Sequence, residues 1–168
     1  GGTAVEVCEV PGTYAGGDWN ADGIILVGGG NAGGPVSRVP ASGGRLAAVT
    51  ALDASLGETA HRWPHFLPDG RRFIYTAVGR DTRLYVGALD SAGRTRILAD
   101  ARGGYYVAPG HLIFQRGKTL MAQRFDPDAL SVDGDAFTVA DDVGLGSILG
   151  TGISVSRAGT VVYRPAQD

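Results

Sequence analysis

The sequence predicts an all-β fold, and three observations lead to this prediction. First, short apolar segments alternate with turn sequences along the chain, and no window of a dozen residues carries the apolar stripe of an amphipathic helix. Second, 28 of the 168 residues are glycine, a residue that tight turns between strands require. Third, the order of apolar strand, glycine turn and second apolar strand recurs four times. We therefore expect antiparallel strands joined by short hairpins.

The four hairpins lie at nearly regular intervals. Their turns are Asp22-Gly23, Asp69-Gly70, Pro109-Gly110 and Ala158-Gly159. Asp-Gly between alternating apolar residues is a strong hairpin signal, because glycine adopts the positive φ that such a turn needs. The turn glycines are 47, 40 and 49 residues apart, close to the period of about 40–50 residues that is typical of propeller blades. The spacing predicts a β-propeller with about four blades, each a four-stranded antiparallel sheet.

Two further strand-like segments follow each of the first three hairpins. They are residues 35–39 and 45–49, 82–89 and 94–99, and 119–125 and 136–140. The period of two in 82–89 places Leu84 and Val86 on one face and Tyr85 on the other. We expect a single propeller domain over 1–168, with blades at about 17–53, 61–100, 104–141 and 150–165.

The two ends of the chain leave two arrangements open. Residues 4–10 read as a lone strand before the first blade, and the last unit has only two strands. The N-terminal strand could close the last blade in a small ring, or the chain could be a piece of a larger propeller, which we favour. Open sheet edges invite pairing with a second copy, so a homo-oligomer is a further expectation.

Composition excludes several classes of protein. The formal net charge of −2 argues against a dedicated nucleic-acid partner. No apolar run is long enough to span a membrane, and Cys8 is the single cysteine, so that no disulfide can form within the chain. A hydrophobic fraction of 43% is sufficient for a packed core.

Four stretches carry a resemblance to a known family. The segment from Gly57 to Tyr75, with its sequence Trp-Pro-His-Phe-Leu-Pro-Asp-Gly, resembles the TolB-like, WD-repeat-like propellers at the C-terminus of bacterial eukaryotic-type serine/threonine protein kinases. Residues 16–26, 108–126 and 153–164 are similar to the same repeats. The resemblance extends from about residue 5 to residue 164.

The resemblance implies a non-catalytic recognition or sensor module. In such kinases the propeller lies outside the membrane, which implies an extracytoplasmic location in a bacterium. The chain has neither a kinase catalytic loop nor a Gly-x-Ser-x-Gly nucleophile motif, so we expect no enzyme activity and no cofactor. Two alternatives stay open: the gating propeller of a prolyl-oligopeptidase-like peptidase, and a secreted structural protein that closes its edges by oligomerisation.

The segment His61-Arg-Trp-Pro-His65 is the richest in chemistry. On a regular strand, residues four apart share a face but lie about 13 Å apart, too far to bind one metal, and no third ligand is evident. We expect Trp63 and Phe66 to pack between blades and the two histidines to cap turns or bond the backbone, with a ligand contact as the alternative.

The remaining binding candidates lie in loops. Asn31, Arg80 and Lys118 belong to loops 31–34, 79–81 and 117–118, which we expect at one mouth of the ring, facing a protein or small-molecule ligand. Four aspartates in 126–135 lack the spacing of a calcium loop and are expected to cap turns of a long connection. The glycines of 144–150 lack the spacing of a nucleotide-binding loop.

Overall fold

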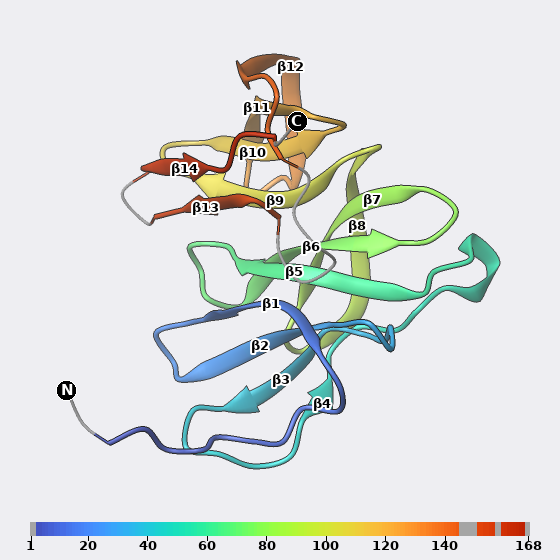
Figure 1. Ribbon diagram of the computed structural model, residues 1–168, viewed down its shortest axis with the longest axis vertical. Helices are drawn as coiled ribbons and strands as arrows, with labels where there is room; N and C mark the ends of the chain where they lie inside the picture. The colour runs from blue at the N-terminus through green and yellow to red at the C-terminus, as the bar shows by residue number, and fades with distance from the viewer. Residues whose placement is uncertain (1–2, 145–150, 157–158, 167–168) are drawn as a thin grey trace.

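The chain folds into three four-stranded antiparallel sheets and a two-stranded hairpin (Figure 1). The computed structural model describes residues 3–144, 151–156 and 159–166. Blade 1 contains β1 (Tyr14–Trp19), β2 (Ile24–Gly29), β3 (Ser37–Pro40) and β4 (Ala47–Ala48). Blade 2 contains β5 (Ala60–Phe66), β6 (Arg72–Val78), β7 (Thr82–Ala88) and β8 (Ser91–Ala99). Blade 3 contains β9 (Arg102–Val107), β10 (His111–Arg116), β11 (Thr119–Asp126) and β12 (Ser131–Ala140), and the hairpin contains β13 (Ile153–Val155) and β14 (Val161–Tyr163).

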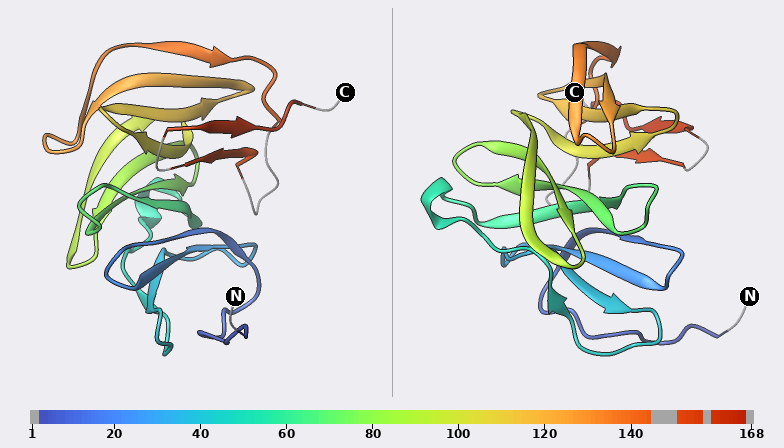
Figure 2. Two further views of the ribbon diagram at one scale, coloured as in Figure 1. Left: turned by 90° about the vertical axis from the view of Figure 1, so that its left-hand side faces the viewer. Right: turned by 180° about the vertical axis from the view of Figure 1, so that it is seen from behind.

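The blades follow one another along the long axis of the molecule. Each is a meander in which consecutive strands pair in order, and a 3₁₀ helix, η1 (Ala54–Leu56), lies in the connection from blade 1 to blade 2. The first strands of successive units, β1, β5, β9 and β13, contact one another and form the inner edge of the stack, and Figure 2 shows the stack from two other sides. The predicted all-β architecture of propeller blades is confirmed.

Three of the predicted hairpin turns form at the expected glycines, and of the fourth turn Gly159 is described while Ala158 lies outside the described residues. Gly23, Gly70, Gly110 and Gly159 have φ values of 75°, 66°, 149° and 83°. A side chain is disfavoured at positive φ because its Cβ approaches the backbone, so these positions explain part of the high glycine content.

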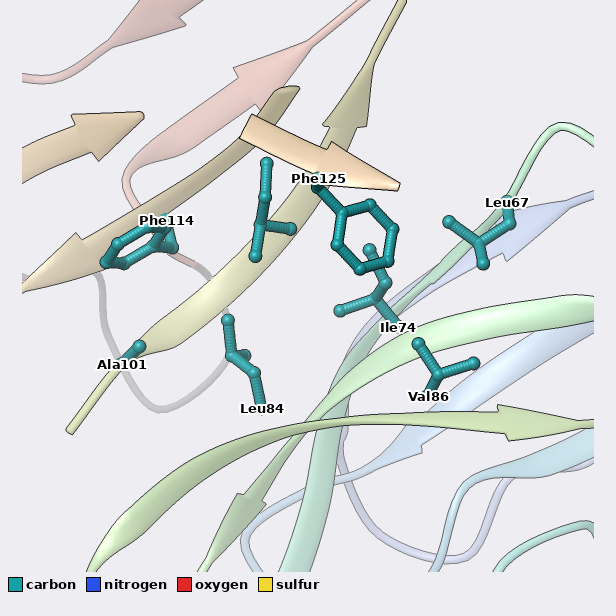
Figure 3. Packing of buried hydrophobic residues seen from close by; sticks show 8 residues of the cluster. Leu67, Ile74, Leu84, Val86, Ala101, Phe114 and Phe125 are labelled. Carbon is teal, nitrogen blue, oxygen red and sulfur yellow. The ribbon is translucent and has the colours of Figure 1, made fainter. Parts of the chain in front are cut away.

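Three apolar clusters fill the spaces between neighbouring units. Figure 3 shows the cluster between blades 2 and 3, in which Leu84 and Val86 of β7 pack against Phe114 and Phe125. Tyr85 points to the opposite face of β7 and joins the cluster between blades 1 and 2. The period of two therefore predicted correctly that Leu84 and Val86 share one face of this strand and that Tyr85 lies on the other. A third cluster joins blade 3 to the hairpin.

Two segments differ from the prediction. Residues 4–10 belong to no strand. The Val7 carbonyl accepts a hydrogen bond from the Gly44 backbone, so this segment follows blade 1 instead of pairing with β14. Residues 126–135 do not form the expected long connection, because a short turn leads into β12 at Ser131. Asp126 caps that turn by accepting hydrogen bonds from the backbone N–H groups of Asp128 and Ala129. β12 is an outermost strand, where exposed aspartates face water.

Candidate functional site

A β-bulge in β5 separates the two histidines that the sequence analysis paired. His61 lies opposite Ala77 and His65 opposite Ile74, so β5 uses one more residue than β6 between these pairs. One extra residue reverses the alternation of side chains, and the two histidines point to opposite faces. The expectation that they share a face was therefore wrong.

His61 is fully buried and joins two side chains. Its Nδ1 lies 2.8 Å from Thr50 Oγ1, and its Nε2 lies 3.0 Å from Glu58 Oε2. Burial lowers the pKa of His61, and the neighbouring Glu58 carboxylate only partly opposes this shift. The neutral imidazole then donates from Nε2 to Glu58 and accepts at Nδ1 from Thr50. Its partners are side chains, not the turn or backbone groups expected from the sequence.

Arg94 of β8 completes this network. Its Nη1 donates to both carboxylate oxygens of Glu58 at 2.8 Å, and its Nη2 lies 3.3 Å from Asp53 Oδ2. Its guanidinium carbon lies 4.2 Å from the ring centre of Tyr85, a cation–π contact. Burial alone would raise the pKa of Glu58, but bonds from Arg94, the Asp53 backbone and His61 outweigh it, and the pKa falls below its usual range.

The connection between blades 1 and 2 positions these groups. Asp53 caps η1 by accepting from the Ser55 backbone, and Gly57 ends the helix in the left-handed region at φ 66°. The next residue, Glu58, turns back and accepts a hydrogen bond from the Asp53 backbone N–H at 2.8 Å. The local sequence thus folds the connection into a loop that brings the Glu58 carboxylate within hydrogen-bond distance of Arg94.

A pocket opens beside this network, between the connection and the adjacent face of blade 2. Its volume is about 430 Å³. It is lined by residues 49–55 of the connection, by Tyr75 of β6 and Gly87 of β7, and by Ala92, Gly93 and Arg94 of β8. His61 and Glu58 lie buried behind this wall and fix the positions of Thr50 and Arg94.

A second polar row crosses the inner strands. His65 Nδ1 lies 3.1 Å from Asp18 Oδ2 of β1, and the same oxygen accepts from the Phe66 backbone at 2.8 Å. The pKa of Asp18 is lowered, since these bonds and the nearby His65 outweigh the effect of burial. The His65 ring lies 5.2 Å from that of Tyr105 in β9, whose hydroxyl bonds Thr151 at 2.7 Å. The row therefore links blades 1, 2 and 3 to the segment before β13.

The three candidate loops lie beside the connections between units. Asn31 is exposed, and its loop meets the end of the first connection through a bridge between Gly34 and Ala60. Arg80 is exposed and packs over Gly57 of the same connection. The Lys118 carbonyl accepts from the Val143 backbone, which belongs to the connection after β12. The loops thus share the edge of the blades at which the chain passes from one unit to the next.

No group of three or more His, Cys, Asp or Glu side chains gathers into a metal site within residues 3–144, 151–156 and 159–166. Over the same ranges, no helix is long and apolar enough to cross a membrane. Most of the glycine segment 144–150 lies outside the described residues.

The comparisons with known proteins support the fold alone. No protein-family model matches the chain, and neither does any curated protein sequence. Among solved structures, the chain is similar to the crystal structure of regucalcin from Agrobacterium tumefaciens, a calcium-binding protein, with a TM-score of 0.61 and 16% sequence identity. The match covers 88% of this chain and 52% of regucalcin, so the chain spans about half the length of that protein. This chain is accordingly a partial β-propeller.

Sequence reasoning missed the buried network because its members carry no shared motif. Asp53 followed by Gly57 is the signature of a short capped helix, so this part of the connection could have been found. The pairing of Glu58 with Arg94 could not, because the two residues meet only when β8 returns beside the connection.

Proposed function

We propose that this chain is a recognition module without catalytic activity of its own, and that further blades complete its ring. The observation that carries the proposal is the common edge at which loops 31–34, 79–81 and 117–118 lie beside the connections between units. Propellers present their binding loops in this way on a rigid scaffold. The match to about half of regucalcin supports the view that the ring is larger than this chain.

We further propose that the module is the extracytoplasmic sensor of a bacterial serine/threonine kinase-like protein. The support is the sequence resemblance, which is strongest in the segment from Gly57 to Tyr75. That segment contains β5 and its hairpin turn, which are structural parts of a blade. The resemblance therefore supports a TolB-like type of propeller. Whether the parent protein is a kinase is what the experiments below test.

The test begins with the native reading frame on both sides of this chain. A kinase catalytic loop and one apolar span of about 20 residues upstream are the expected result. A hydrolase sequence with serine, aspartate and histidine motifs downstream would overturn the sensor proposal and make the chain a gating propeller.

A second experiment tests the loops in the full-length protein. Replacing Asn31, Arg80 and Lys118 together by alanine should abolish the response of kinase autophosphorylation to its stimulus. The matched control replaces Asp22 and Asp128, which are exposed in hairpin turns at the opposite edge of the blades, and should leave the response intact. Equal loss in both variants would contradict the assignment of the binding edge.

Self-association is a second candidate function, and the hairpin favours it. Val162 and Tyr163 of β14 are 64% and 42% exposed, and this unit has two strands where the three blades have four. An apolar edge strand readily pairs with another chain. Light scattering across a concentration series tests this: a mass that stays equal to one chain would exclude it.

A further inference from the structure

The first strand of every unit carries an aromatic or aliphatic side chain four residues before the glycine of its hairpin turn. The residues at this position are Trp19, Phe66, Tyr106 and Val155. Phe66 is 9% exposed and belongs to the cluster between blades 1 and 2, and Tyr106 packs against the cluster between blades 2 and 3. Val155 packs against the cluster between blade 3 and the hairpin. In these three units, the side chain at this position therefore lies at the interface with the preceding unit.

Blade 1 carries the same feature on the face that points away from blade 2. Trp19 is 56% exposed, and Tyr14 of the same strand is 59% exposed. The two residues pair with positions of β2 that are four apart, so their side chains share a face, which is opposite to that of Leu26. Leu26 belongs to the cluster between blades 1 and 2. Blade 1 thus presents two aromatic side chains where each later unit contacts its predecessor.

Residues 4–10 occupy the place of an outermost strand in the order of the chain. An outermost strand precedes each of the later first strands, since β4 leads to β5, β8 to β9 and β12 to β13. Residues 4–10 precede β1 in the same way, and their sequence has the alternation of a strand. In the described part of the chain, this segment makes a single backbone–backbone hydrogen bond, from the Gly44 N–H to the Val7 carbonyl. Its strand-like sequence is therefore left without a sheet.

We propose that residues 4–10 are the outermost strand of a further blade, which packs on the face of blade 1 that carries Trp19. The partner is a three-stranded antiparallel sheet, and its strands precede residue 4 in the native chain, because every described blade is a meander of consecutive strands. This inference rests on the proposed module with further blades and specifies how its ring continues. A second copy does not suit this face, since 88% of this chain already matches 52% of regucalcin, and two whole copies would exceed a ring of that length.

The hydrogen bond to Gly44 indicates which residues of the segment pair with the further blade. In an extended segment, successive residues direct their backbone N–H and C=O groups to opposite sides. Since the Val7 carbonyl faces Gly44 of blade 1, the backbone groups of Glu6 and Cys8 face the other side. The N–H groups of Glu6 and Cys8 are therefore the donors available to the further blade.

The test compares hydrogen exchange by mass spectrometry in the full-length native protein and in this chain. We expect peptides that cover residues 4–10 to exchange at least about a hundredfold more slowly in the full-length protein, because a sheet then protects their amides. Loop 31–34 of blade 1 is the control and should exchange equally in both. Equal exchange of residues 4–10 in the two proteins would overturn the inference, and so would a reading frame without strand sequences upstream of residue 4.

A pair of proline variants tests the pairing itself. Cys8→Pro removes an N–H that we expect to donate to the further blade, whereas the matched control Val7→Pro removes an N–H on the other side. In the full-length protein, Cys8→Pro should lower the thermal midpoint of the propeller and restore fast exchange of residues 4–10, and Val7→Pro should do neither. In this chain both variants should keep the original midpoint, because neither N–H donates to a described backbone group. Equal effects of the two variants in the full-length protein would refute the strand assignment.

The outcomes separate this inference from the proposed function. If the reading frame encodes a membrane kinase but residues 4–10 exchange freely, the sensor role stands and the strand assignment is wrong. If residues 4–10 are protected but the reading frame encodes no membrane kinase, the strand assignment stands and the sensor proposal is wrong.

Discussion

Replacing Glu58 by glutamine tests how much the buried network stabilises the connection between blades 1 and 2. The Glu58 side chain is 1% exposed and accepts hydrogen bonds from Arg94, His61 and the Asp53 backbone. Glutamine keeps one acceptor oxygen but turns an N–H group toward a donor and leaves the Arg94 charge with Asp53 alone. Removing one partner of a buried ion pair destabilises by about 3–5 kcal/mol. Because Arg94 is 20% exposed and keeps Asp53, we expect the lower part of this range.

The assay is urea unfolding of the original chain and of Glu58→Gln at pH 7. We expect the unfolding free energy of Glu58→Gln to be lower by about 3 kcal/mol. In a thermal scan, the same loss corresponds to a fall in the midpoint of roughly 6–12 °C for a chain of this size. The control is Asp81→Asn, which removes an exposed ion pair with Arg83 and should change the unfolding free energy by less than about 1 kcal/mol. A loss in Glu58→Gln no larger than in the control would refute the reasoning.

The pH dependence of the same pair of chains gives an independent check. The pKa of Glu58 is lowered in the folded state, so its contribution is present above the unfolded value near 4.5 and is lost as the pH falls through the folded pKa. The difference between the original chain and Glu58→Gln should therefore shrink below pH 4.5. The pKa of His61 is also lowered, so both chains should lose stability as the pH falls below 6.5. A difference that stays constant down to the acid transition would contradict the ionised state of Glu58.

Three further predictions concern the blades. Phe114→Ala removes a fully buried ring between blades 2 and 3 and should lower the unfolding free energy in urea by about 3–5 kcal/mol. Gly28→Ala would place a Cβ 2.3 Å from the Ala15 carbonyl oxygen, so circular dichroism should show a lower thermal midpoint; an unchanged midpoint would contradict the close approach of β1 and β2. Asp18→Ala leaves the Phe66 backbone N–H without its acceptor and should lower the unfolding free energy in urea by about 1–3 kcal/mol, whereas Asp18→Asn should retain most of that bond.

The sequence was sufficient for the features that depend on short segments. Turn glycines such as Gly70 and the alternation of Leu84 with Tyr85 each depend on one or two strands, and both formed as predicted. The alternation in residues 4–10 also resembles a strand, but a strand needs a ladder of hydrogen bonds to a neighbouring strand. In the described part of the chain this segment accepts a backbone hydrogen bond from Gly44 and forms no such ladder. A local pattern therefore predicted which segments can form strands, and the packing decided which of them do.

The geometry of the site depends on a β-bulge and on packing between blades, and no local sequence pattern indicates either of them. The bulge in β5 reverses the alternation between His61 and His65, so a correct strand prediction still gave the wrong faces. Trp63 lies inside this bulge at φ 50° and packs close to Gly16, where a Cβ would come within 2.9 Å of the ring. The packing of blade 1 against blade 2 therefore fixes where the extra residue goes, and only the assembled pair of blades contains that information.

The buried charges are best explained by the pocket that they support. The apolar cluster between blades 1 and 2 already closes that interface with residues such as Leu26 and Phe73. A buried ion pair rarely stabilises a protein more than apolar side chains of similar size would, so stability alone gives no reason for Glu58 and His61 at this position. What the charges provide is geometry: Glu58 fixes Arg94, His61 fixes Thr50, and both supported residues line the pocket. The buried network of Glu58 and His61 therefore connects the packed interface between blades 1 and 2 with the wall of the pocket.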